Sequence, residues 1–163
     1  MGERFSAQLV SRGDLRKIRE ELAQSNKNVV FTNGCFDLLH RGHIEYLREA
    51  RALGDILIVG LNSDKSVATL KGPGHPLMPH EDRAALLCEL RSVSYVCLFD
   101  DPSVLGLVRD LLPDILVKGG DYSLDEVVGK ELVEAAGGKV MTLSEWPGMS
   151  SSELICKARS VQT

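Results

Sequence analysis

His40 and His43 are the residues whose types and spacing point most directly to chemistry. They stand three positions apart with Gly42 between them, shortly after the polar, turn-forming stretch 32–37. Residues three apart on a helix share one face, and the first helical turn offers unpaired N–H groups and the positive end of the helix dipole. Two imidazoles on such a turn favour phosphate binding over a purely structural role.

Three further cationic side chains lie where predicted elements end or begin. Lys71 opens the loop 71–76, whose two glycines and two prolines exclude helix and central strand. Lys118 comes directly after the apolar stretch 115–117, where a lysine is out of place in a core. Arg83 lies near the start of a predicted helix. A solvated surface position is the open alternative for Lys71 and Arg83.

This set of donors and cations lacks a nucleophile paired with a base. Cys35 follows a predicted strand, but no histidine stands at a spacing that would activate it, so packing or a backbone contact is favoured. The set suits phosphoryl or nucleotidyl transfer, in which the protein positions reactants and neutralises charge on phosphate oxygens. We expect Mg²⁺ to be held mainly by the triphosphate, with no metal ligand from the protein. The chain has no Walker loop, which ends in Gly-Lys-Ser/Thr.

Strands and helices must alternate along the chain to position these groups. Short apolar runs predict strands, and amphipathic or capped stretches between them predict helices. The pattern predicts an α/β fold with a Rossmann-like parallel five-stranded sheet and helices on both faces, in a single domain over 1–163. Residues 1–13 show no clear pattern. The predicted strands are 29–31, 56–61, 93–98, 115–117 and 140–143, and the predicted helices are 14–24, 44–53, 65–70, 81–90, 101–112, 124–136 and one from Ser150.

The candidate residues follow the carboxyl ends of these strands. Parallel sheets bind ligands at those ends, where the strand order reverses. The histidine pair follows the first predicted strand, Asn62 and Asp64 follow the second, and the stretch 118–121 follows the fourth. If the first and fourth strands are neighbours, these groups face one crevice. Ser150 and Glu153 match a capping box, which accounts for the serines at 150–152 without a binding role.

Composition and charge narrow the function classes. Of 163 residues, 44% are hydrophobic and 26% charged, which is typical of a globular protein. The net charge of −4 argues against a nucleic-acid partner. The start of the chain lacks the apolar core of a signal peptide, and no apolar run is long enough for a membrane span. The scattered cysteines indicate reduced thiols in a cytoplasmic protein: Cys35, Cys88, Cys97 and Cys156.

The stretch 32–43 resembles the first motif of the cytidylyltransferase-like nucleotidyltransferases, whose hallmark is His-x-Gly-His. Later motifs narrow the resemblance to the adenylyltransferases that make ADP-heptose from D-glycero-β-D-manno-heptose 1-phosphate for lipopolysaccharide. The run Val-Lys-Gly-Gly-Asp-Tyr at 117–122 is the most discriminating. Many bacteria carry this domain fused behind a sugar kinase, and this chain resembles the stand-alone form. The similar stretches are 29–43, 59–64, 70–74, 116–122 and 148–155.

The resemblance implies transfer of AMP from ATP to the sugar 1-phosphate, with Mg²⁺ as cofactor and a homodimer as the assembly. It implies that His40, His43 and Lys71 are catalytic on the phosphates. The implied nucleotide site also includes Thr32, Asn33, Gly34, Cys35, Phe36, Gly42, Lys118, Gly119, Ser150, Ser151 and Ser152. The implied sugar-phosphate site consists of Asp37, Asn62, Lys71, Arg83, Gly120 and Asp121.

The chain departs from that family at three places. His75 replaces a common arginine, Ser151 and Ser152 replace two threonines, and Ser94 replaces an aspartate near a subunit contact. The base and the exact sugar stay open. One alternative is a CTP-dependent cytidylyltransferase acting on a polyol phosphate or another sugar phosphate. The other is a nucleotide-binding module without turnover.

Overall fold

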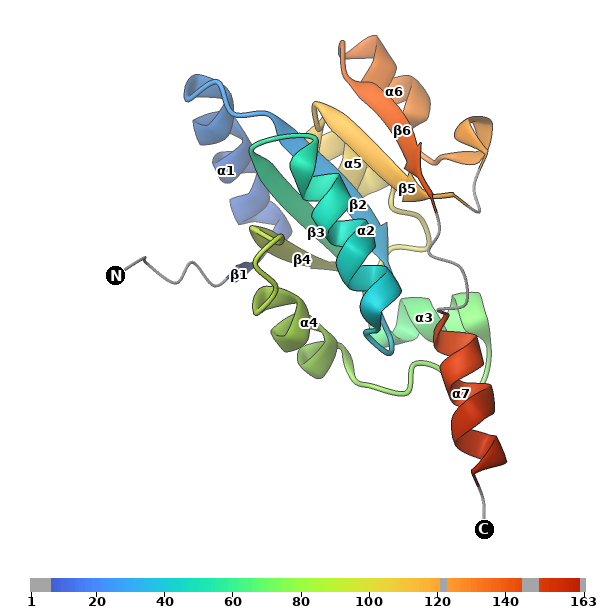
Figure 1. Cartoon of the computed structure of the whole chain (residues 1–163). Coiled ribbons are helices and arrows are strands. Elements are labelled where there is room, and N and C mark those ends of the chain that lie inside the picture. Colours follow the sequence, from blue (N-terminus) through green and yellow to red (C-terminus); the bar gives the residue numbers. More distant parts are fainter. Residues whose placement is uncertain (1–6, 121–122, 145–149, 162–163) are drawn as a thin grey trace.

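Short β-branched and apolar runs form a parallel sheet in the order β1-β4-β3-β2-β5-β6 (Figure 1). The computed structural model describes residues 7–120, 123–144 and 150–161. Every strand pairing within them is parallel, which confirms the predicted α/β class. The strands are β1 (Gln8–Val10), β2 (Val29–Gly34), β3 (Ile56–Asn62), β4 (Tyr95–Phe99), β5 (Ile115–Gly119) and β6 (Lys139–Leu143).

The sheet has six strands, so the prediction of five was wrong. The additional strand is β1, which pairs with β4 at one edge of the sheet. It lies in the segment 1–13, where the sequence shows no pattern. Because β1 has only 3 residues, it is too short to display the alternation that reveals a strand.

Helices cover both faces of the sheet, as predicted (Figure 1). Val30 on β2 packs in one core with Leu47 from α2, whereas its neighbour Phe31 packs in the other core with Leu107 from α5. Helix α4 also contributes side chains to the first core, and helices α1 and α6 contribute side chains to the second. The helices are α1 (Arg12–Gln24), α2 (Arg41–Ala52), α3 (Asp64–Lys71), α4 (His80–Cys88), α5 (Leu105–Leu111), the 3₁₀ helix η1 (Leu124–Glu126), α6 (Lys130–Ala135) and α7 (Ser151–Ser160).

Two helix predictions need correction. The helix expected from residue 101 begins at Leu105, and Asp101 instead accepts a hydrogen bond from Arg12 at 2.9 Å. The helix expected over 124–136 is divided into η1 and α6. Gly129 interrupts it with a left-handed φ of 95°, and a Cβ there would lie 2.7 Å from Val108 Cγ1. The positive φ of Gly129 interrupts the helix, and the absence of a side chain there leaves room for Val108 of α5.

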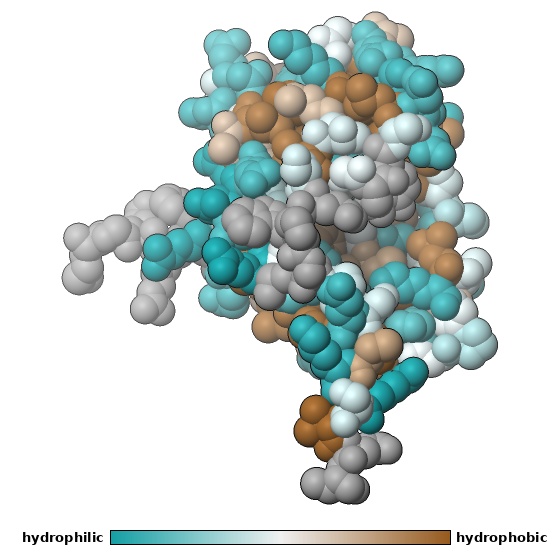
Figure 2. Space-filling model, turned by 45° about the vertical axis from the view of Figure 1, so that its right-hand side comes forward, coloured by the Kyte–Doolittle hydropathy of each residue, from teal (hydrophilic) through white to brown (hydrophobic). Residues whose placement is uncertain are grey.

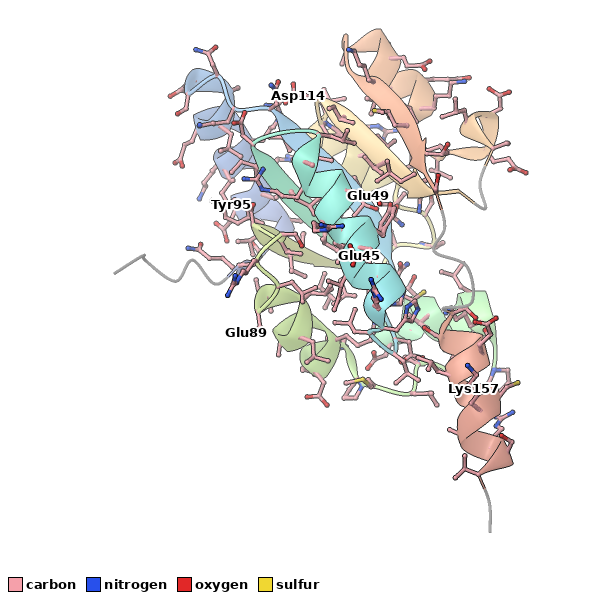
Figure 3. All side chains as sticks on the ribbon, in the orientation of Figure 1. Glu45, Glu49, Glu89, Tyr95, Asp114 and Lys157 are labelled. Atoms are coloured by element: carbon pink, nitrogen blue, oxygen red, sulfur yellow. The ribbon has the colours of Figure 1, made fainter. Side chains whose placement is uncertain are left out.

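Asp114 connects three elements at the amino ends of the central strands (Figure 3). One carboxylate oxygen accepts from Arg19 of α1 at 3.0 Å, and the other accepts from the Val29 N–H of β2 at 2.7 Å. Asp114 itself directly precedes β5. This contact sets the start of β2 against β5, so it helps to fix the opposite ends of these strands, where the candidate site lies.

Gly54, which follows α2, lies in a space that is too tight for a side chain. A Cβ there would lie 2.7 Å from Val30 Cγ2 and 2.9 Å from the Asn28 carbonyl oxygen. We expect Gly54→Ala to lower the free energy of unfolding by about 1–3 kcal/mol, because a backbone carbonyl cannot rotate away. Urea unfolding measures this. The control is Gly13→Ala on exposed α1, where the nearest atom is 3.8 Å away; it should be neutral or stabilising. Equal stability of both variants would contradict the prediction.

α7 projects from the body of the molecule (Figure 2), and none of its residues is buried. Its first turn is nevertheless tied to the body, as described below. None of the helices in the described part of the chain has the length and apolar character that a bilayer crossing requires.

Candidate active site

The carboxyl ends of β2 and β5 open into a cavity of about 780 Å³. The two strands are neighbours, and the chain winds away from them in opposite directions, so the strand order reverses here. This confirms the condition under which the candidate groups share one crevice. The volume is in the range of small-molecule sites.

Most of the predicted site residues line this cavity. Three described ones do not: Thr32, Arg83 and Gly120. Thr32 is fully buried and its hydroxyl is 2.7 Å from the Tyr46 hydroxyl, while Gly120 is exposed beyond β5. Asp121 and the stretch 145–149 lie outside the described residues. The predicted residues that line the cavity are Asn33, Gly34, Cys35, Phe36, Asp37, His40, Gly42, His43, Asn62, Lys71, Lys118, Gly119, Ser150, Ser151 and Ser152.

The two histidines sit on the first turn of α2, as their spacing predicts. His40 is the N-cap residue, and its ring stacks on that of His43 with centroids 3.9 Å apart and planes at 27°. The centroid of the Phe36 ring lies 5.3 Å from that of His43, with the ring planes at 59°. Phe36 has a φ of 46°, a left-handed conformation that is rare for an aromatic residue. This turn carries the chain from β2 back toward the stacked pair.

Burial favours the neutral forms of both imidazoles in the free protein. Burial lowers the pKa of His43 to about 4, and the neighbouring charges of His40 and Lys71 act in the same direction. Burial also lowers the pKa of His40, although Glu153 opposes this shift. Each neutral ring can donate one N–H, and an anion bound beside them would favour their charged forms. The pair is therefore suited to respond to a polyanion.

The lowered pKa of His43 makes stability depend on pH. Between pH 6.5 and about 4 the unfolded chain binds a proton at this position that the folded chain does not, so stability falls as the pH falls through this window. Between pH 7.5 and 5 we expect the wild type to lose on the order of 1–2 kcal/mol of unfolding free energy through His43. The His43→Gln variant should not show this part of the loss. Urea unfolding from pH 7.5 to 5 measures both proteins. Parallel profiles would contradict the prediction, and saturating pyrophosphate should shrink the wild-type loss.

Lys71 and Lys118 bring positive charge to the cavity from two sides. Lys71 is the last residue of α3, and its charge acts on both Cys35 and His43. Lys118 donates from β5 to the Asn33 carbonyl of β2 at 3.4 Å. Burial raises the pKa of the Cys35 thiol despite these cations, so the thiol stays protonated. This agrees with the expectation that Cys35 is no nucleophile, and all four cysteines are free thiols.

The first turn of α7 closes another side of the cavity. Ser150 and Glu153 form both halves of the predicted capping box. Ser151 donates its hydroxyl to the Leu38 carbonyl at 3.2 Å, which ties α7 to the segment just before α2. Capping and this tie account for two of the three serines, and Ser152 also lines the cavity.

Sequence reasoning missed the wall that follows β4. Phe99 ends that strand and residues 102–104 follow it, so the strand-end rule that found the other groups would have found these if it had been applied to β4. Tyr46 follows His43 by three residues, so the helical spacing that pairs His40 with His43 also places Tyr46 on that face. The missed lining residues are Tyr46, Leu70, Phe99, Pro102, Ser103, Val104, Glu126, Val128, Ser144 and Glu153.

The carboxylates on the cavity wall already have partners within the described chain. Asp37 accepts backbone N–H groups of residues 77 and 78. Glu126 accepts from Ser123, and Glu153 accepts from the Ser150 N–H. The wall thus offers phosphate-binding cations and N–H groups rather than a cage of free carboxylates. This donor set fits a magnesium ion carried by a triphosphate.

A Rossmann-like sheet with a stacked His-x-Gly-His pair at a strand end defines a nucleotidyltransferase-type protein. The cytidylyltransferase-like family model matches residues 31–157, and the chain belongs to that family. The chain is 48% identical to bifunctional protein HldE of Syntrophotalea carbinolica over 93% of its own length and 31% of that protein. It is 55% identical to HldE of Citrifermentans bemidjiense over 82% of its length and 28% of that protein. The chain thus spans about 30% of the length of these relatives.

Two solved structures resemble the fold. The lipopolysaccharide core biosynthesis protein of Thermoplasma volcanium superposes with a TM-score of 0.61 at 32% identity, covering 74% of this chain and 97% of that one. A pantoate-beta-alanine ligase from Francisella tularensis superposes with a TM-score of 0.60 at 15% identity, covering 94% and 77%. The second likeness concerns the fold alone.

Proposed function

We propose that the protein transfers AMP from ATP to D-glycero-β-D-manno-heptose 1-phosphate, giving ADP-heptose and pyrophosphate. The observation that carries the proposal is the stacked pair of His40 and His43, which shares one cavity with Lys71 and Lys118. The identity of about 50% to proteins named HldE supports the adenylyl and heptose assignments. The likeness to a lipopolysaccharide core biosynthesis protein supports a lipopolysaccharide role.

The chemistry needs no protein nucleophile. A phosphate oxygen of the sugar phosphate attacks the α-phosphorus of ATP in line, the bond to the bridging oxygen of the β-phosphate breaks, and pyrophosphate leaves. His40 and His43 donate N–H groups to the phosphates, and the two lysines neutralise charge as it moves toward the leaving group. These groups sit at or beside the ends of α2, α3 and β5, so regular elements hold their backbones. A Mg²⁺ ion bound with the triphosphate would supply further charge neutralisation.

The test is pyrophosphate release with Mg²⁺, using ATP, CTP, GTP and UTP in parallel against the heptose 1-phosphate. Release with ATP alone supports the proposal. Release only with CTP, or only with a polyol phosphate as acceptor, would replace it with the cytidylyltransferase alternative. If no nucleotide released pyrophosphate with any sugar or polyol phosphate, the interpretation as a nucleotide-binding module without turnover would remain.

Two expectations from the sequence stay predictions: a homodimer and a cytoplasmic location. Ser94, which replaces an aspartate near a subunit contact of the family, accepts a hydrogen bond from the Leu57 N–H of β3 at 3.2 Å. The serine therefore has a role within the subunit. Light scattering of the purified protein, which gives the molar mass in solution, decides between monomer and dimer.

A further inference from the structure

The loop 72–79 joins α3 to α4 and begins directly after Lys71. Gly72 and Gly74 give it a left-handed backbone, with φ of 86° and 83°. Two buried charged side chains hold this loop: Asp37, which is 3% exposed, and Arg83, which is 0% exposed. Both were predicted to bind the sugar phosphate, yet their contacts are made with the protein itself.

Asp37 faces the loop with both carboxylate oxygens. Oδ1 accepts from the N–H groups of Leu77 at 2.8 Å and Met78 at 2.9 Å. Oδ2 lies 2.9 Å from the Leu77 nitrogen and 3.4 Å from His75 Nδ1. Burial would raise the pKa of Asp37, but these N–H groups, His75 and the charge of Arg83 together hold it below its usual value. The carboxylate is charged and its acceptor capacity is spent on the loop.

Arg83 reaches the same loop from α4. Its Nε donates to the Met78 carbonyl at 3.0 Å. Its Nη1 donates to the carbonyl oxygens of Cys35 at 2.6 Å and Asn62 at 2.9 Å, at the ends of β2 and β3. Its Nη2 donates to Asp64 at 2.6 Å. One planar guanidinium thus joins the loop to two strand ends, a geometry that lysine cannot reproduce.

We propose that Asp37 and Arg83 are positioning residues of the transfer reaction, forming a clamp on loop 72–79 that sets Lys71 against the two histidines. Both residues bind Met78 near the α4 end of the loop, and Arg83 also binds Asp64, the first residue of the helix α3 that ends at Lys71. Asp37 also belongs to the segment that leads from β2 to His40. The clamp therefore joins the two parts of the chain that carry the phosphate-binding groups. This inference rests on the proposed function.

The geometry matters because lysine is a long, flexible side chain. Lys71 can stabilise developing charge only if its backbone is held in register with the histidines before the reaction. The clamp supplies that register through side chains that are themselves buried, and Asp37, although it lines the cavity, directs its hydrogen bonds to the loop. It also gives His75 a place: the imidazole that replaces the family's arginine lies beside Asp37 and does not line the cavity.

The kinetic test is Asp37→Asn, which keeps the shape but loses the charge and one acceptor oxygen. We expect kcat to fall about 10–100-fold while KM for ATP changes by less than about threefold. In a Lys71→Ala background the same substitution should cost less than about threefold more, because the residue acts through Lys71. The matched control is Asp82→Asn, an exposed residue of α4 outside the clamp. If Asp37→Asn lowered kcat by the same factor in the Lys71→Ala background as in the wild type, the proposal would be overturned.

The second test needs no substrate and uses trypsin cleavage of the folded protein at the Lys71–Gly72 bond. Asp37→Asn and Arg83→Lys should each be cut about tenfold faster than the wild type and Asp82→Asn. If Asp37→Asn does not fold, the cleavage rate of Arg83→Lys tests the proposal instead. Unchanged cleavage, or faster cleavage with an unchanged kcat, would overturn the clamp. If the wild type transferred nothing, the proposed function would fail, and cleavage alone would still decide whether the two residues hold the loop.

Discussion

Replacing either His40 or His43 with alanine should lower kcat for adenylyl transfer by about 10²–10³-fold. The two rings stack at 3.9 Å on the first turn of α2, and both line the cavity with Lys71. Burial lowers the pKa of both rings and so favours their neutral forms in the free protein. The proposed reaction moves negative charge from the α-phosphate to pyrophosphate, and donors aimed at that charge stabilise the transition state more than the bound substrate.

Steady-state pyrophosphate release measures this effect, with His80→Ala as the control because that histidine does not line the cavity. The double variant should be far less impaired than the product of the single losses, because the stacked rings act on the same phosphates. If His40→Ala kept its function in cells and its rate in solution, the nucleotide-binding module would become the better interpretation of this chain.

Arg83→Met should lower the free energy of unfolding by about 3–5 kcal/mol. The guanidinium is fully buried, and its removal strands the carbonyl oxygens of Cys35, Asn62 and Met78 without a donor. Asp64 loses its partner as well, but its side chain is 38% exposed and water can replace that contact. The stranded carbonyls therefore dominate the expected loss.

Urea unfolding followed by circular dichroism measures this loss, at low temperature to keep the variant folded at the start. Arg109→Met is the matched control, because Arg109 is an exposed arginine in the last turn of α5. Its effect should stay within about 0.5 kcal/mol. A loss below about 1 kcal/mol in Arg83→Met would mean that water or a rearranged loop satisfies the carbonyls.

The sequence alone was sufficient to predict those features that depend only on residues close together in the chain. Short apolar runs predicted five of the strands, because a short, β-branched apolar run between turn residues is typical of a strand in a parallel sheet. The histidine spacing predicted a shared helical face, and Ser150 with Glu153 predicted a capping box, because both depend on residues within one turn. The strand-end rule then placed most of the lining residues in one cavity.

Only the tertiary structure decided what depends on residues distant in sequence. β1 is a strand because β4 lies beside it, and the left-handed backbone of Gly129, packed closely against Val108 of α5, separates α6 from η1. The same holds for the site. Asp37 and Arg83 have residue types suited to a sugar phosphate, and the sequence offers no sign that loop 72–79 would occupy their hydrogen bonds. A side chain's chemistry is set by its type, whereas its partner is set by the fold.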